Sequence, residues 1–259
     1  MFLQCLPRFV HLRVLILLCF SLASLVAQAE PNTDTGCVDV HQLPLVDTST
    51  PELVADYARA VSIAFAQVTR LQDAINAGHL RASEIERETL LSDFHQSYQR
   101  HTDSAFDTRA PGLLGYYRQS FLQAYMQVID TYRDFMLAGG PDAFVPAFFR
   151  AELLVELNQR LDGRIFAVAS MTDDELVNLD SSVSYLMQGL PTRQAAQDLL
   201  EKRHSEMTTL EVGDRFLRYQ PMVLAPGCVS CHERNGVFQE VGGYGGALII
   251  DARIDEGVN

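Results

Sequence analysis

The run Cys228-Val229-Ser230-Cys231-His232 constrains this chain more than any other stretch of its sequence. Two cysteines separated by two residues and followed directly by a histidine form the attachment pattern of c-type haem. The spacing suits the chemistry, because two nearby thiols can each form a thioether bond with one vinyl group of a single porphyrin. The adjacent imidazole can then bind the iron as an axial ligand. The sequence therefore predicts one covalent haem c, held by Cys228 and Cys231, with His232 as the proximal ligand.

The N-terminus has the features of a secretory signal peptide. Arg8 and Arg13 precede an apolar run from Val14 to Leu25, and Ala27-Gln28-Ala29 matches an A-x-A cleavage site. The apolar run is about a dozen residues, shorter than the ~20 of a spanning helix, which favours cleavage over an uncleaved anchor. Residues 1–29 are therefore predicted to be removed. The mature protein is predicted to be periplasmic and to lack a membrane span, and covalent haem attachment also takes place outside the bacterial cytoplasm.

Three other uses of the cysteine pair fit its surroundings less well. A structural zinc site takes about four N or S ligands, usually as two pairs, whereas the predicted mature chain offers one pair, Cys37 and scattered histidines. A thioredoxin-like pair follows a strand in a βαβ unit, but here Pro226-Gly227 precedes the pair and a glycine-rich segment follows. A plain disulfide would leave His232 without a role.

The chain is acidic, with 33 acidic against 20 basic residues and a formal net charge of −13. This charge disfavours nucleic acid as a partner, because such binding depends on cationic contacts with phosphates. It would suit a basic patch on a redox partner protein, although solubility is the simpler explanation of the acidity.

Residues 50–161 are predicted to be helical. Apolar residues recur at steps of three and four from Val54 onward, which predicts a helix capped by Thr50 and ended by Gly78. A second helix is predicted to open at a capping box formed by Ser83 and Glu86.

Two further helices are predicted in this half, one over 113–137 and one over 142–161 with a kink at Pro146. The first of them carries an aromatic and aliphatic stripe. Packing in the core is the default explanation of such a stripe, and a pocket wall or electron path beside a haem is the alternative. The stripe consists of Leu114, Tyr117, Phe121, Tyr125, Val128, Tyr132 and Phe135.

Residues 162–259 are predicted to form a small antiparallel sheet domain. Apolar or strand-like runs predict strands over 165–169, 215–224 and 247–250. Capping residues and glycines predict helices over 172–189 and 192–207. The predicted fold class is therefore α+β, with a helical N-terminal half packed on this sheet domain.

The second axial ligand of the iron is the least determined part of the predicted site. Residues 30–49 are predicted to be an extended leader that holds Cys37, the odd thiol of the mature chain. A thiolate can ligate haem iron, so Cys37 is a candidate distal ligand, although an unpaired leader cysteine is the simpler reading. His204 and Met207 form a further candidate pair, and Met222 is close to the motif in sequence.

Two other features near the motif suit a haem. Arg215 and Arg218 precede it and could pair with the propionates, although a solvated strand face is an equally good explanation. The glycine-rich segment 242–246 follows it and would permit close backbone approach to a flat ligand.

The order of elements in this region is a strand, two helices, Arg218-Tyr219-Gln220-Pro221, the Cys-x-x-Cys-His run and a Gly-Tyr-Gly-Gly-Ala-Leu-Ile-Ile strand at 243–250. In this order residues 160–253 resemble the PAS-like c-type haem domain family. Its members occur as exported cytochromes and as periplasmic sensor modules of chemotaxis receptors and histidine kinases. The resemblance implies a PAS-like sheet domain in which Cys228, Cys231 and His232 hold the haem. It leaves the second axial ligand open, because that position varies within the family.

These observations predict a periplasmic monohaem c-type cytochrome for single-electron transfer or redox sensing. The alternative is a gas- or ligand-binding haem sensor that acts through a partner, either a redox partner protein or a membrane sensor. A haem peroxidase would need a distal His or Arg for acid–base catalysis, and the sequence assigns none. The oligomeric state does not follow from the sequence.

Overall fold

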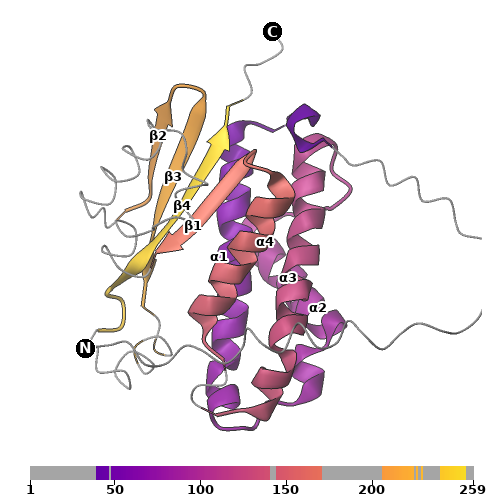
Figure 1. Ribbon diagram of the computed structural model, residues 1–259, viewed down its shortest axis with the longest axis vertical. Coiled ribbons are helices and arrows are strands. Elements are labelled where there is room, and N and C mark those ends of the chain that lie inside the picture. Colours follow the sequence, from indigo (N-terminus) through magenta and orange to yellow (C-terminus); the bar gives the residue numbers. More distant parts are fainter. Residues whose placement is uncertain are drawn as a thin grey trace, which may run out of the picture. The chain divides into compact units, whose positions relative to one another are not determined.

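A computed structural model describes residues 39–46, 48–140, 144–170, 206–224, 226, 229 and 240–254. In this part of the chain, helices form one layer and a four-stranded antiparallel sheet forms the other (Figure 1), which confirms the α+β class. Several predicted features lie outside the described residues and stay predictions. They are the signal peptide, Cys37, the helices expected between 172 and 205, His204, and the motif residues Cys228, Cys231 and His232.

Helix α1 spans Thr50–Asn76 and begins at a capping box. The hydroxyl of Ser49 accepts a hydrogen bond from the N–H of Glu52 at 3.4 Å, and the Glu52 carboxylate accepts one from the N–H of Ser49 at 2.8 Å. The prediction of Thr50 as the cap was wrong by one residue, because Ser49 has the extended backbone that brings its oxygen to this N–H. The helix stops before Gly78, whose φ of 65° is left-handed, as predicted.

Helix α2 spans Arg87–Thr102 and begins later than predicted. A short 3-10 helix, η2 (Ala82–Ile85), precedes it, so the predicted capping box of Ser83 with Glu86 does not form. Instead, the Glu84 carboxylate accepts a hydrogen bond at 2.9 Å from the backbone N–H three residues before it. This bond holds the tight turn, and the extended backbone of Glu86 separates the turn from α2.

Helices α3 and α4 span Gly112–Ala138 and Pro146–Leu161. Pro146 starts α4 instead of kinking it, because a proline is well accommodated in the first turn, where its missing N–H has no partner to lose. The helix ends at Asp162, which adopts a left-handed φ of 43°, and the chain turns directly into the first strand. In the described part of the chain, no helix is long and apolar enough to cross a membrane.

The sheet contains β1 (Ile165–Ser170), β2 (Thr208–Val212), β3 (Arg215–Val223) and β4 (Tyr244–Arg253) in the order β1-β4-β3-β2, with every neighbouring pair antiparallel. Strand β2 was not predicted, and Met207 before it is not helical, so the helix expected up to that residue does not reach it. Polar residues and an edge position give β2 little of the apolar signal on which strand prediction depends.

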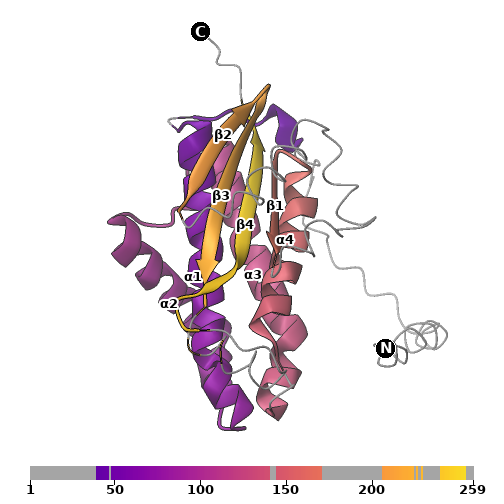
Figure 2. The ribbon, with the colours of Figure 1, turned by 90° about the vertical axis from the view of Figure 1, so that its left-hand side faces the viewer.

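The two faces of the sheet belong to different apolar clusters. One face packs on α1 and α4 and joins the core of the helical layer, through Ile165, Ala167, Phe216, Leu248, Ile250 and Ala252. The other face carries a separate buried cluster, called here the second sheet cluster, of Phe166, Val168, Leu217, Tyr219, Ala247 and Ile249. Figure 2 shows the four helices all behind the sheet, on the first face.

Asn158 of α4 forms hydrogen bonds with the outer edge of β1. Its amide nitrogen donates to the carbonyl of Ala167 at 2.8 Å, and its amide oxygen accepts from the N–H of Ala167 at 2.9 Å. In an antiparallel pair, alternate residues direct both backbone groups away from the partner strand. The side chain of Asn158 therefore takes the place that a neighbouring strand would take.

Candidate functional site

The predicted haem motif lies in the connection between β3 and β4, called here the motif connection. Its three predicted haem-binding residues are outside the described part, but its two ends are described. The N–H of Leu224 donates to the carbonyl of Gly243 at 2.9 Å, and the N–H of Gly242 donates to the carbonyl of Leu224 at 2.8 Å. These bonds hold the two ends of the connection together, directly beyond the last strand pair, Val223 with Tyr244.

The strand register brings a second connection to the same end of the sheet. Ser170, the last residue of β1, lies opposite Ala247 near the start of β4. Thr208, the first residue of β2, lies opposite Tyr219 in the middle of β3, and the rest of β2 runs away from the motif connection. The long segment between β1 and β2, which contains His204, therefore starts and ends on the side of the sheet where the motif connection emerges.

Two positions at this end of the sheet require glycine, because neighbouring atoms of the protein leave no room for a Cβ. A Cβ on Gly243 would lie 2.9 Å from the carbonyl oxygen of Glu240, and one on Gly245 would lie 2.8 Å from a methyl group of Leu224. The sequence suggested that glycines here allow approach to a flat ligand. At these two positions the close neighbours are instead atoms of the motif connection and its flanks.

Met222 faces the helical layer. Its sulfur contacts Nη1 of Arg150 in α4, and the Arg150 guanidinium lies over the ring of Phe65 in α1, 4.5 Å from the centroid. Arg150 is buried. The methionine closest to the motif in the described sequence is therefore engaged between α1, α4 and β3, on the face of the sheet opposite the second sheet cluster.

Arg215 lies at the end of β3 away from the motif connection. Its Nε donates to the Asp251 carboxylate at 2.7 Å in a largely buried pair. Burial raises the pKa of Asp251, and the hydrogen bond from Arg215 opposes that rise. Because Arg215 already has a carboxylate partner at this distant end, the structure does not favour the predicted pairing of this residue with a haem propionate.

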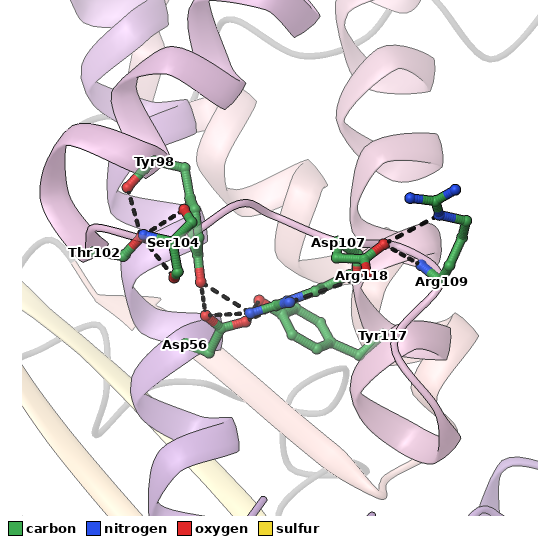
Figure 3. A network of polar contacts seen from close by, with 8 residues as sticks. All are labelled: Asp56, Tyr98, Thr102, Ser104, Asp107, Arg109, Tyr117 and Arg118. Carbon is green, nitrogen blue, oxygen red and sulfur yellow. Dashed lines mark hydrogen bonds and ion pairs between the residues drawn. The ribbon is translucent and has the colours of Figure 1, made fainter. Parts of the chain in front are cut away.

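The most elaborate polar cluster of the described residues lies inside the helical layer (Figure 3). Arg118 of α3 reaches both carboxylate oxygens of Asp56 in α1, with Nε 3.0 Å from Oδ2 and Nη2 3.1 Å from Oδ1. Tyr117 donates to Oδ2 at 2.8 Å, and Tyr98 of α2 donates to Oδ1. The guanidinium also donates to the carbonyl of Asp107 at 3.4 Å, which ties down the turn before α3.

This cluster holds its tyrosines in the neutral form. Burial, with the Asp56 carboxylate beside it, raises the pKa of Tyr98 to about 12, and the same causes raise the pKa of Tyr117 well above its usual range. Both hydroxyls therefore remain hydrogen-bond donors at physiological pH. With each charged group bonded, the cluster joins three helices and is not arranged as an acid–base pair open to a substrate.

Sequence reasoning missed this cluster. The available signal was Asp56 itself, a carboxylate on the same helical face as the buried Leu53 and Ala60. A charged residue inside an apolar stripe demands a buried partner. The partner could not be identified, because Arg118 is 62 residues away in the chain.

The aromatic stripe on α3 is largely core. Tyr117, Phe121, Tyr125 and Val128 are buried, whereas Phe135 is 54% exposed. The rings of Phe121 and Tyr125 pack with Phe94, and those of Tyr117 and Phe121 pack with Phe106. This placement agrees with the default explanation of the stripe as packing of the helical layer.

A cavity of about 790 Å³ opens at the end of the sheet remote from the motif connection. Arg164 before β1 and Arg253 at the end of β4 are among its lining residues, as is His41, whose ring lies 3.3 Å from the Asp162 carboxylate. Within the described ranges, no three His, Cys, Asp or Glu side chains are grouped so as to hold a metal ion.

The described elements define an α+β protein in which a four-helix layer covers one face of an antiparallel sheet. Comparisons of the chain with protein-family models, with curated proteins and with solved structures found no match.

Proposed function

We propose that this protein is an exported monohaem c-type cytochrome that serves single-electron transfer or redox sensing. In this proposal Cys228 and Cys231 form the thioether bonds and His232 is the proximal iron ligand. The observation that carries the proposal is the Cys-x-x-Cys-His run, placed in a connection whose two ends are bonded to each other at Leu224. The bound haem would supply a one-electron couple.

The second sheet cluster supports the fit of a haem to this part of the chain. It is apolar, as the face of a porphyrin is, and it lies on the side of the sheet that the four described helices leave uncovered. Ala247 of this cluster is opposite Pro221, a few residues before the motif. Met222 and Arg150 lie on the other face, so the proposal gives them no direct bond to the iron.

The antiparallel sheet also supports the resemblance of residues 160–253 to PAS-like c-type haem domains. In the proposal the motif connection precedes the last strand, β4, as the family pattern requires. The acidic composition, with a net charge of −13, would steer a partner protein that presents a basic surface. The proposed compartment is the periplasm, on the strength of the N-terminal pattern of arginines, apolar run and A-x-A site.

One observation favours the second candidate, a gas- or ligand-binding haem sensor. The contact of Met222 with Arg150 occupies the nearest methionine sulfur in the described sequence, which is the kind of side chain that fills the sixth position in electron-transfer cytochromes. An open or weakly filled position would allow a small ligand to bind.

The test uses the full chain expressed with its own N-terminus in a bacterium that matures c-type cytochromes. We expect the periplasmic protein to retain haem on a denaturing gel stained for haem peroxidase activity. Cys228→Ala combined with Cys231→Ala should lose the stain, and Cys37→Ala should keep it. A wild-type protein that folds in the periplasm without covalent haem would refute the proposal.

The two candidate functions are separated by carbon monoxide. Addition of the gas to the reduced protein should leave the absorption spectrum of an electron carrier with two firm axial ligands unchanged. A saturable shift of the Soret band would instead support the sensor.

A further inference from the structure

The packing of α1 on β3 brings the positions of Arg59, which is exposed, and Arg218, which is half-buried, close together. The amide of Gln220 donates to the hydroxyl of Ser62 at 3.2 Å, which fixes α1 against β3. Arg59 is one turn before Ser62, and Arg218 is two positions before Gln220 on the same face of the strand.

The relative direction of the two elements supports this arrangement. Phe65, one helical turn after Ser62, and Met222, two residues after Gln220, both contact Arg150. The helix and the strand therefore run in the same direction. One helical turn before Ser62 is Arg59, and two residues before Gln220 is Arg218, so these two positions also lie near each other. Burial lowers the pKa of Arg218, and the positive charge of Arg59 lowers it further.

Neither arginine has a carboxylate partner among the described residues. Nη2 of Arg218 donates to Oε1 of Gln220 at 3.3 Å, whereas its buried Nε has no acceptor there. Arg215, on the same strand, shows the contrast, since it pairs with Asp251. Two neighbouring arginines that lack an acidic partner among the described residues are unexpected in a chain with 33 acidic residues.

We propose that Arg59 and Arg218 bind a small oxyanion, a phosphate or carboxylate group, at the interface of α1 and β3. Guanidinium forks match the geometry of such groups and bond them bidentately. A bound anion would accept hydrogen bonds that the described residues leave unmade and would offset the repulsion between the two cations. The proposal is independent of the haem, because this face of the sheet is the one covered by the helices.

Inorganic phosphate is the probe, titrated calorimetrically into the purified full chain at constant ionic strength. Saturable binding is expected for the wild type. Arg59→Gln and Arg218→Gln should each weaken it roughly tenfold or more, because each removes charge-assisted hydrogen bonds. Arg70→Gln is the matched control. This residue is exposed on the same helix, also lacks an acidic partner in the described residues, and should leave the affinity unchanged.

Three results would overturn the site. They are the absence of saturable phosphate binding, equal binding by Arg59→Gln and wild type, and an equal response to chloride, which would indicate general screening. Arg59 is exposed, so Arg59→Gln is expected to fold, and thermal unfolding without phosphate checks this. In that measurement it should be no less stable than the wild type, since the substitution removes a like charge. Arg218→Lys, which keeps the charge but not the fork, should bind phosphate with intermediate affinity.

Discussion

The guanidinium of Arg118 and the carboxylate of Asp56 form a two-pronged ion pair inside the helical layer, with both side chains about nine-tenths buried. Two tyrosine hydroxyls complete the bonding of the carboxylate. A buried ion pair stabilises the folded protein little more than well-packed apolar side chains in its place would. Removal of one partner, however, leaves the other as an uncompensated buried charge. Its effect is therefore best measured by removing one partner.

Asp56→Ala is expected to destabilise the protein by roughly 3 to 5 kcal/mol, because Arg118 would remain charged and buried without its partner. The free energy of unfolding in urea measures the loss. Asp130→Ala, which breaks the exposed pair with Arg87, is the control and should cost at most about 1 kcal/mol. Equal losses in the two variants would contradict the importance given to the buried cluster.

Stability is expected to fall as the pH rises from about 10 towards 12. Burial and Asp56 raise the pKa of Tyr98 to about 12 in the folded state, whereas an unfolded tyrosine titrates near 10. The folded protein then holds a proton that the unfolded chain has lost, so the contribution is complete below pH ~10 and disappears above the folded value. Urea unfolding between pH 9 and pH ~12 should show a shallower decline in Tyr98→Phe than in Tyr116→Phe, a tyrosine outside the cluster.

Asn158→Ala is expected to cost about 2 to 4 kcal/mol, because the N–H and carbonyl of Ala167 would both lose their bonds at a buried site. Asn158→Asp should also destabilise, since a carboxylate cannot donate to the Ala167 carbonyl. Gln159→Ala, at the exposed neighbouring position, serves as the control. An unchanged unfolding midpoint in Asn158→Ala would show that the edge of β1 does not depend on this amide.

Gly243→Ala is expected to loosen the base of the motif connection. Its Cβ would lie 2.9 Å from a backbone oxygen of Glu240, which can move only if the connection moves, at a cost of roughly 1 to 3 kcal/mol. Gly245→Ala meets the end of the Leu224 side chain, which can shift, and should cost less. The haem content per protein and the unfolding midpoint should both fall further in Gly243→Ala, and the reverse order would contradict this account.

Met222→Ala should leave the axial ligation of the proposed haem unchanged. The Met222 sulfur contacts Arg150 on the helical side of the sheet, so its removal affects packing there. The absorption spectra of the oxidised and reduced variant should match those of the wild type, recorded beside Cys37→Ala and His204→Ala. A conversion of the spectrum from low spin to high spin in Met222→Ala would overturn this prediction.

The helical half was predictable because its signals are local. Three- and four-residue periodicity located α1, and Val54, Tyr57, Val61 and Val68 are buried as that pattern implies. The errors occurred at helix starts, where a single hydrogen bond decides between Ser49 and Thr50. Strand β2 was missed because its residues are mostly exposed and lack alternation.

The candidate site could be predicted from the sequence only in part. The cysteine and histidine spacing is readable in the sequence, but the pairing of Leu224 with Gly243 and the shared end of two connections depend on strand register. The Asp56 cluster joins residues from three helices, and no local pattern connects Asp56 with Tyr98 or Arg118. Contacts between distant segments depend on how the helices and strands pack, and this packing cannot be read from the local patterns of a single sequence.

The bonds between Asn158 and Ala167 also set how the two layers can move. Both bonds involve one residue of β1, so a slide of α4 along the strand by a single position would break them together, with no intermediate arrangement that keeps either. The helices and the sheet should therefore shift relative to each other at this point only when both hydrogen bonds break at once. Any signal that passes between the layers would have to pass around this fixed point or release it completely.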